Sequence, residues 1–129
     1  MVFLDQNNSA QGTLYMDDGI SFEYENNNFL YMSYEFKDNI LTSKIESKDT
    51  SKTYFEEVKN AYKFMENIYI YGISIETLQK LNCISLSYDE KDGYKTSDMI
   101  IKYEFTELVL TITDIYIPVD TEFKIQLNF

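Results

Sequence analysis

The chain has 129 residues, enough for one domain with a single hydrophobic core. Its 22 acidic residues outnumber 11 basic residues, all lysine, so the net charge is −11, and the chain contains neither histidine nor arginine. The lack of histidine excludes an imidazole general base and histidine metal ligands. The excess of negative charge opposes binding to nucleic acid or to an anionic membrane surface, and no cofactor is expected.

The N-terminal third of the chain has the pattern of consecutive β-hairpins. From Ile20 to Glu25 the apolar side chains of Ile20, Phe22 and Tyr24 alternate with polar ones, which predicts a half-buried strand. Three further strands are expected, with short polar clusters between them as turns: Leu14 to Met16, Phe29 to Phe36, and Ile40 to Glu46. Together these four strands predict a hairpin meander.

The middle of the chain contains a stretch with helical spacing. Apolar side chains recur on one helical face over residues 53–65, and Thr53 with Glu56 matches a capping box. We therefore expect one short inserted helix near residues 53–65. A single helical turn is also expected from Glu76 to Leu81.

The remainder returns to strand patterns. Five strands are expected: Ile68 to Ile73, Ile84 to Tyr88, Met99 to Phe105, Leu108 to Thr113, and Phe123 to Phe129. The single cysteine, Cys83, stands in an apolar run and is predicted to be a small buried side chain. Residues 1–129 thus predict one all-β domain, an antiparallel β-sandwich with a hairpin meander and one inserted helix.

Asp17, Asp18 and Gly19 predict a structural turn between two strands, because Gly19 accepts a positive φ and aspartate tolerates one. Neighbouring strand residues point to opposite faces, so the two aspartates are not expected to act as a catalytic pair. A calcium ion on Asp17 and Asp18 is the less favoured alternative. We therefore predict no catalytic residue and no metal site.

The segment from Gly12 to Tyr24, GTLYMDDGISFEY, resembles the hairpin that opens the last β-sandwich domain of glycoside hydrolase family 31 α-glucosidases. Residues from Phe29 to Phe36 and from Asn39 to Ser43 resemble the next strands of that domain. Met65 to Gly72 is similar to a strand that ends in glycine before a loop. Residues 51–63 depart from the family pattern, and the overall pattern is most similar to the glucosidase II branch.

The resemblance implies a C-terminal, non-catalytic domain of a retaining α-glucosidase. Both catalytic carboxylates of such enzymes lie in an upstream (β/α)8 barrel, and a barrel needs about 250 residues. The expected partner is therefore the catalytic barrel of the parent enzyme, which removes terminal α-linked glucose from oligosaccharides or N-glycans. A parent of the glucosidase II type implies the endoplasmic reticulum lumen, with Met1 inside a longer protein.

Four tyrosines, Tyr31, Tyr34, Tyr69 and Tyr71, are candidates for a surface that stacks on a sugar or docks on another domain. Because tryptophan, the strongest stacking ring, is absent, core packing or docking is favoured over sugar binding. The alternative is a free-standing module that binds carbohydrate or another protein.

Asn7-Asn8-Ser9 matches the acceptor sequence for N-glycosylation. Such triplets arise often by chance in asparagine-rich chains, so the match alone is a weak signal.

Overall fold

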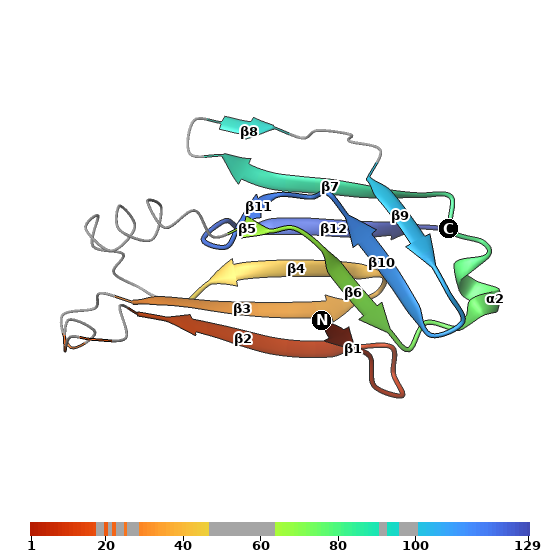
Figure 1. Ribbon diagram of the computed structural model, residues 1–129, viewed down its shortest axis with the longest axis horizontal. Coiled ribbons are helices and arrows are strands. Elements are labelled where there is room, and N and C mark those ends of the chain that lie inside the picture. Colours follow the sequence, from red (N-terminus) through yellow and green to blue (C-terminus); the bar gives the residue numbers. More distant parts are fainter. Residues whose placement is uncertain are drawn as a thin grey trace.

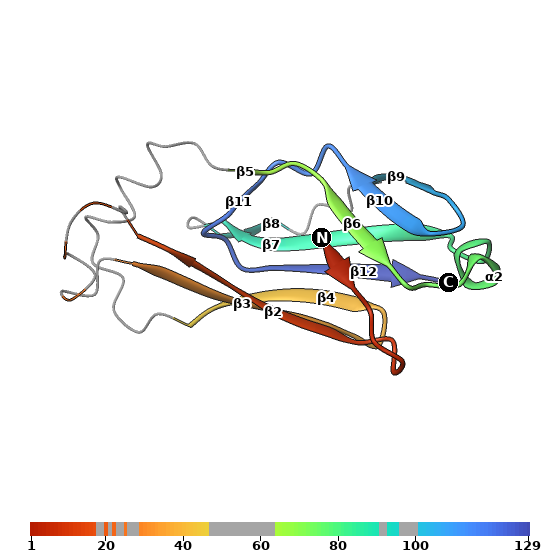
Figure 2. The same cartoon turned by 60° about the horizontal axis from the view of Figure 1, so that its bottom comes forward.

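The computed structural model describes residues 1–17, 20, 22, 25, 29–46, 64–90, 93–95 and 101–129. These residues form two larger β-sheets that lie one over the other, a two-stranded sheet and one short helix (Figure 1). The turned view in Figure 2 shows the two layers from the side. The predicted all-β sandwich is confirmed.

The larger sheet has six antiparallel strands in the order β2-β3-β4-β12-β7-β8. Their bounds are β2 Ala10–Met16, β3 Leu30–Lys37, β4 Ile40–Ile45, β12 Phe123–Asn128, β7 Cys83–Glu90 and β8 Gly93–Lys95. The strands β2, β3 and β4 form two consecutive hairpins. The β3–β4 hairpin agrees with the prediction, whereas the predicted neighbour of β2 is the segment from Ile20 to Glu25 and its observed partner is β3. The C-terminal strand β12 lies between β4 and β7 and joins the two halves of the chain.

The smaller sheet has four strands in the order β1-β6-β10-β9, which cross the other sheet obliquely (Figure 1). Their bounds are β1 Val2–Phe3, β6 Ile68–Tyr71, β10 Val109–Thr113 and β9 Lys102–Phe105. The β1 and β6 strands are parallel, and the other pairs are antiparallel. A separate pair joins β5, Phe64–Met65, to β11, Ile117–Pro118.

The core lies between the two sheets and follows from the two-residue period of the strands. In β6, Ile68 and Ile70 point inward; in β10, Leu110 and Ile112 do so, and all four are at most 4% exposed. From the larger sheet, Phe36, Leu41, Leu86 and Ile125 belong to the same buried cluster. The helix α2, Ile75–Leu78, buries Leu78 in this cluster, and Ser74 caps its start by accepting a hydrogen bond from the Thr77 N–H.

The turn between β3 and β4 explains how this hairpin closes in two residues. Asp38 and Asn39 have φ values of 51° and 64°, and Lys37 pairs with Ile40 across the turn. Two positive φ values in succession are the requirement of a type I′ hairpin turn, and Asp and Asn tolerate them.

The strand predicted from Ile20 to Glu25 is wrong at the residues of this segment that the structure describes. Ile20 and Phe22 are 93% and 74% exposed, and neither they nor Glu25 lies in a strand. The Glu25 N–H instead donates to the Phe22 carbonyl over 3.0 Å. The reason is pairing: the antiparallel partner of β2 is β3, so this alternating segment belongs to the connection between them.

The inserted helix predicted near residues 53–65 lies mostly outside the described residues. At its end it is wrong, because Phe64 and Met65 form strand β5. The prediction for Cys83 is also wrong: this residue is exposed. It pairs with Asn128 and begins β7 on the outer side of the sheet, so Ile84 is the residue that points into the core. Over the described residues, no helix is long and apolar enough to cross a membrane.

Candidate functional site

The outer face of the four-stranded sheet carries exposed aromatic side chains over β1 and β6. Since Ile68 and Ile70 point inward, Tyr69 and Tyr71 point outward. Phe3 stands opposite Tyr71 in the register, and their rings stack with centroids 4.7 Å apart and planes 13° apart. We call Phe3, Tyr69, Tyr71 and Val109 the aromatic face.

Strand pairing orders this face into a row. Tyr71 lies between Phe3 on one side and Val109 on the other, and Tyr69 lies opposite Thr111. Phe3 is 65% exposed, and Leu108, which precedes Val109, is 77% exposed. Exposed apolar side chains of this kind cost free energy in water, which burial against another surface would recover.

The β9 side of the same sheet is charged. Lys102 Nζ lies 3.3 Å from the Asp114 carboxylate, and Glu104 pairs with Thr111. The sheet therefore presents an aromatic area bordered by charge, as the centre and rim of protein interfaces do.

The outer face of the six-stranded sheet is mainly polar. Its paired side chains include Ser33 opposite Lys44, Glu35 opposite Thr42 and Gln126 opposite Ser85. The Ser33 hydroxyl donates to Glu46 over 2.8 Å, and this bond holds the pKa of Glu46 below its usual value. This face has the character of a solvated surface.

One end of that polar face has an aromatic group of its own. Tyr15 lies opposite Tyr31 in the β2–β3 pair, and its ring stacks on Phe29 with centroids 5.4 Å apart. The Tyr15 hydroxyl donates to Asp17 over 3.1 Å. We call Tyr15, Phe29 and Tyr31 the Tyr31 group.

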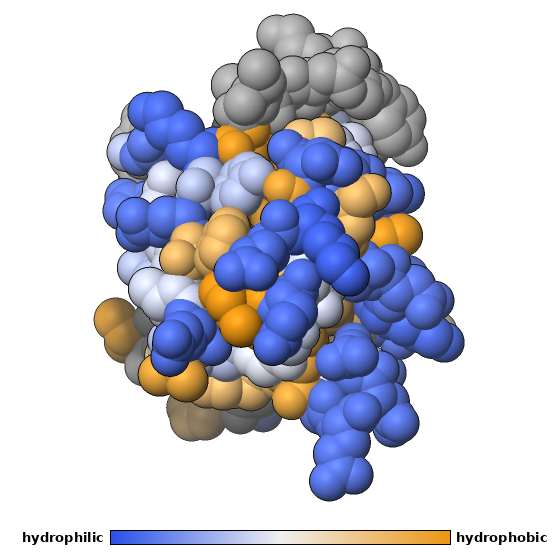
Figure 3. Space-filling view, turned by 90° about the vertical axis from the view of Figure 1, so that its right-hand side faces the viewer, coloured by the Kyte–Doolittle hydropathy of each residue, from blue (hydrophilic) through white to orange (hydrophobic). Residues whose placement is uncertain are grey.

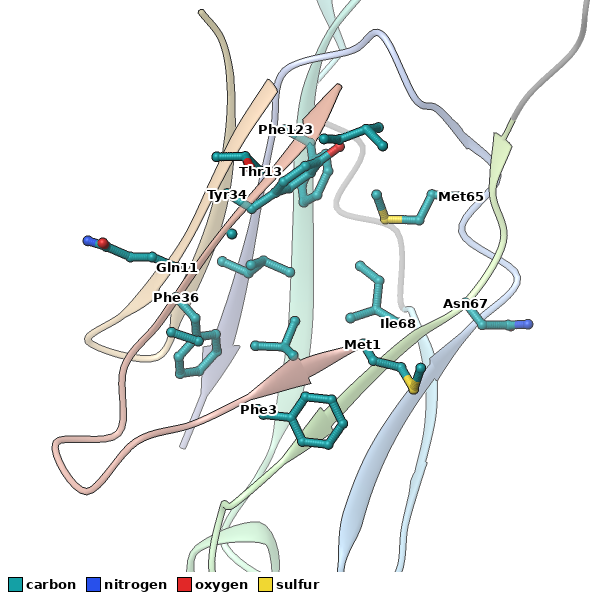
Figure 4. A pocket seen from close by; sticks show the side chains of 15 residues that line it. Met1, Phe3, Gln11, Thr13, Tyr34, Phe36, Met65, Asn67, Ile68 and Phe123 are labelled. Atoms are coloured by element: carbon teal, nitrogen blue, oxygen red, sulfur yellow. The ribbon is translucent and has the colours of Figure 1, made fainter. Parts of the chain in front are cut away.

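A cavity of about 470 Å³ lies between the sheets where β1 approaches β2. Tyr34 and Phe123 stand at one end of it, and Met1 and Phe3 at the other, with Phe36 on the β3 side (Figure 4). Burial raises the pKa of the Tyr34 phenol. None of the described lining residues is an aspartate or glutamate, so the cavity does not hold the carboxylate pair that glycoside hydrolysis uses.

The structure separates the four tyrosines predicted to share a surface. Tyr69 and Tyr71 lie together on the aromatic face, Tyr31 lies on the outside of the other sheet, and Tyr34 points between the sheets against Phe123. Tyr31 and Tyr34 are an odd number of residues apart in one strand, so they occupy opposite faces. Sequence reasoning missed Phe3, because a two-residue strand has no measurable alternation.

The other predicted site lies partly outside the described residues. Of the turn residues, Asp17 is described, whereas Asp18 and Gly19 are not. In the described part of the chain, no three His, Cys, Asp or Glu side chains come together as a metal site.

The end of the molecule near α2 is mostly hydrophilic, with small separate groups of hydrophobic residues (Figure 3).

Comparison with known proteins extends the resemblance to nearly the whole chain, although no protein-family model matches. The chain is 35% identical over 127 residues to neutral alpha-glucosidase AB of Dictyostelium discoideum. The match covers 98% of this chain and 12% of that protein. It thus spans only a small part of the relative's length.

Solved structures share the fold. The glucosidase II α subunit with Glc1Man2 bound matches with a TM-score of 0.74 at 21% identity. An endoplasmic-reticulum glucosidase II complex, made of the catalytic subunit and the binding domain of the regulatory subunit, contains a chain that matches with a TM-score of 0.75 at 23% identity. Each match covers 98% of this chain and 14% of the other. The resemblance is thereby confirmed: this chain is related, over nearly its whole length, to one segment of the glycoside hydrolase family 31 α-glucosidases.

Proposed function

We propose that residues 1–129 are one non-catalytic domain, the C-terminal domain of a family 31 α-glucosidase, which packs against the catalytic barrel and stabilises it. The observation that carries this proposal is the aromatic face, with Phe3 stacked on Tyr71 and Val109 beside them. The relatives' greater length supports it, because this chain corresponds to 12–14% of them.

The energetics favour the aromatic face as the contact. Interfaces between domains of one chain cover about 600–1,500 Å². Removing apolar surface from water stabilises by about 25 cal/mol per Å², so a buried ring contributes about 1.5–3 kcal/mol. The polar outer face of the six-stranded sheet would lose hydration on docking and offers less in return.

The parent enzyme is proposed to hydrolyse terminal α-linked glucose from oligosaccharides or N-glycans. Its acid/base residue and nucleophile belong to the barrel, and this chain supplies packing. The relatives are named α-glucosidases, and one related subunit was solved with Glc1Man2 bound. Another is named as an endoplasmic-reticulum enzyme, which supports a location in that lumen.

The test replaces the face in the full-length parent enzyme. Phe3→Ser with Tyr71→Ser is expected to lower the thermal midpoint of the whole enzyme and shorten the half-life of its α-glucosidase activity. The matched control is Tyr31→Ser, which changes a tyrosine on the other sheet. Equal thermal midpoints and half-lives for the double variant and the unchanged enzyme would reject docking through this face.

The isolated chain gives a second readout. With its docking face uncovered, it is expected to self-associate as its concentration rises in sedimentation, although a charge of −11 opposes association. The Phe3→Ser, Tyr71→Ser variant is expected to remain monomeric. A monomeric unchanged chain at both low and high concentration would count against an exposed docking face.

The Tyr31 group favours one alternative, a carbohydrate-binding module. Its stacked Tyr15 and Phe29 rings and adjacent Tyr31 lie on a polar face, as in surfaces that stack on sugars. Calorimetric titration with maltooligosaccharides tests this function. Micromolar binding that is lost in Tyr31→Ala and kept in Tyr71→Ala would favour the module over docking.

A further inference from the structure

The turn between β1 and β2 contains the acceptor triplet Asn7-Asn8-Ser9, which has no role in the proposed docking. It is the only Asn-X-Ser/Thr triplet in the printed sequence. Residues 5–8 are all exposed, and the turn projects beyond the sheets where β2 begins (Figures 1 and 2). A side chain on this turn has room for a large substituent.

Asp5 holds the turn together. Its Oδ1 atom accepts the backbone N–H groups of Asn7 and Ser9 over 2.8 and 2.9 Å, and the Ser9 hydroxyl lies 3.0 Å from both carboxylate oxygens. Asn8 has a φ of 55°, and its N–H donates to the Asp5 carbonyl over 3.0 Å. The bonds from Asn7 and Ser9 N–H groups use main-chain atoms, so a sugar on the Asn7 side chain leaves them intact. The Asn7 side-chain amide also interacts with the Asp5 carboxyl and lowers its pKa, and a glycosylated amide keeps one N–H for that interaction.

The position is also compatible with docking. In Figure 2 the β1–β2 turn lies on the side of the larger sheet, opposite the side on which the outer surface of β6 and β10 is presented. A glycan at Asn7 extends into solvent there and does not need to cross the stacked Phe3 and Tyr71 rings.

We propose that Asn7 is an N-glycosylation site. The Asn7 Nδ2 atom attacks the anomeric carbon of a lipid-diphosphate-linked oligosaccharide: the Nδ2–C1 bond forms, the bond from C1 to the diphosphate oxygen breaks, and one amide proton is lost. The Ser9 hydroxyl completes the acceptor that the transferase recognises. This modification requires the lumenal location included in the proposed function.

The experiment sends the full chain into the lumen of eukaryotic cells behind a cleavable secretory signal. A C-terminal tag with its own Asn-Gly-Thr acceptor reports contact with the transferase. Peptide N-glycosidase in heavy-oxygen water then converts each glycosylated asparagine to labelled aspartate, which peptide mass spectrometry locates.

We expect label at Asn7 and in the tag of the unchanged chain. Asn7→Gln is expected to remove the first label only, and the matched control Asn8→Gln, which keeps Asn7 and Ser9, is expected to retain both. A labelled tag with an unlabelled Asn7 would overturn the proposal. The secretory signal, and not the parent enzyme, brings the chain into the lumen. A negative result in the docking experiments therefore does not affect the glycosylation result, and an unlabelled Asn7 does not affect the docking result.

Native treatment adds a second measurement. Since Asn7 is exposed, peptide N-glycosidase is expected to remove the glycan from the folded chain. The melting temperature of the chain is expected to change little when the glycan is removed. A glycan that is released only after unfolding would place Asn7 in a buried setting and contradict the turn geometry on which the proposal rests.

Discussion

Gly72 lies directly against Leu4, where the chain leaves β6 beside the end of β1. A Cβ atom on Gly72 would stand 3.1 Å from Leu4 Cβ and 3.4 Å from the Leu4 carbonyl oxygen, and Gly72 has a φ of +105°. The Leu4 N–H donates to the Tyr71 carbonyl over 3.0 Å. This close approach fixes β1, and with it Phe3 of the aromatic face, against β6.

Gly72→Ala is therefore expected to destabilise the fold by about 1–3 kcal/mol, because an L-residue is strained at this φ. The new methyl group also presses on main-chain and side-chain atoms of Leu4. Urea unfolding monitored by circular dichroism measures the loss. Gly12→Ala is the control, since nothing lies within 4 Å of a Cβ at Gly12, and a similar loss in both variants would contradict the explanation.

Ser43 is a buried polar residue that joins β4 to the segment before β12. Its hydroxyl donates to the Thr121 carbonyl over 3.2 Å and accepts the Phe123 N–H over 2.9 Å, and Ser43 is 7% exposed. Ser43→Ala leaves the Phe123 N–H without this acceptor in the interior, so we expect a loss of about 1–3 kcal/mol.

Chemical denaturation of Ser43→Ala measures that loss. Ser87→Ala, on the outer side of β7 opposite Lys124, serves as the matched control and is expected to change the free energy of unfolding far less. If the two variants unfold at the same urea concentration, the Ser43 hydroxyl does not contribute as described.

The long strands could be predicted from the sequence because their alternation is strong. In β12 every second residue is apolar and buried, and in β3 Leu30, Met32 and Phe36 are buried with the half-buried Tyr34 on the same face. A shift by one residue would expose the entire set. Strands β1, β5 and β11 have two residues each, which is too short for any period. They exist because a partner pairs with them, as Val2 does with Ile70, and that information is non-local.

Ile20 and Phe22 show that alternation alone does not establish a strand. Period two is compatible with a strand, but strand formation also depends on which segments pair, and β2 pairs over residues 10–16 directly with residues 30–36 of β3. The candidate surface could be predicted in part. Tyr69 and Tyr71 are two residues apart and share a face, whereas Tyr31 and Tyr34 are three residues apart and lie on opposite faces. Phe3 and Val109 join the surface through pairing alone.

Tyr34 makes stability depend on alkaline pH. Burial raises the pKa of its phenol above the ordinary value of 10.0, so the folded state favours the neutral form. A raised folded-state pKa contributes stability that is fully present below pH 10.0 and is lost as the pH rises through the folded-state pKa. The free energy of unfolding of the unchanged chain, minus that of Tyr34→Phe, is thus expected to fall above about pH 10.

Urea unfolding of both chains at about pH 8 and about pH 11 measures this change. Other tyrosines ionise in the same range in both proteins, and the difference between the two chains isolates Tyr34. A difference in unfolding free energy that is constant, or that increases with pH, would contradict a raised pKa.

Asp5 gives the opposite dependence at acidic pH. The Ser9 N–H lowers the pKa of its carboxyl most, and the Asn7 N–H and the Ser9 hydroxyl act in the same direction. A lowered folded-state pKa contributes stability that is present above the ordinary value of 3.8 and is lost as the pH falls through the folded-state pKa.

Asp5→Asn removes the charge while keeping one acceptor oxygen. The unchanged chain is therefore expected to melt at a higher temperature than Asp5→Asn near neutral pH, and this difference is expected to shrink below about pH 4. Melting curves of the two chains across this range measure the effect, and a difference that persists at the lowest pH would show that the charge of Asp5 does not stabilise the β1–β2 turn.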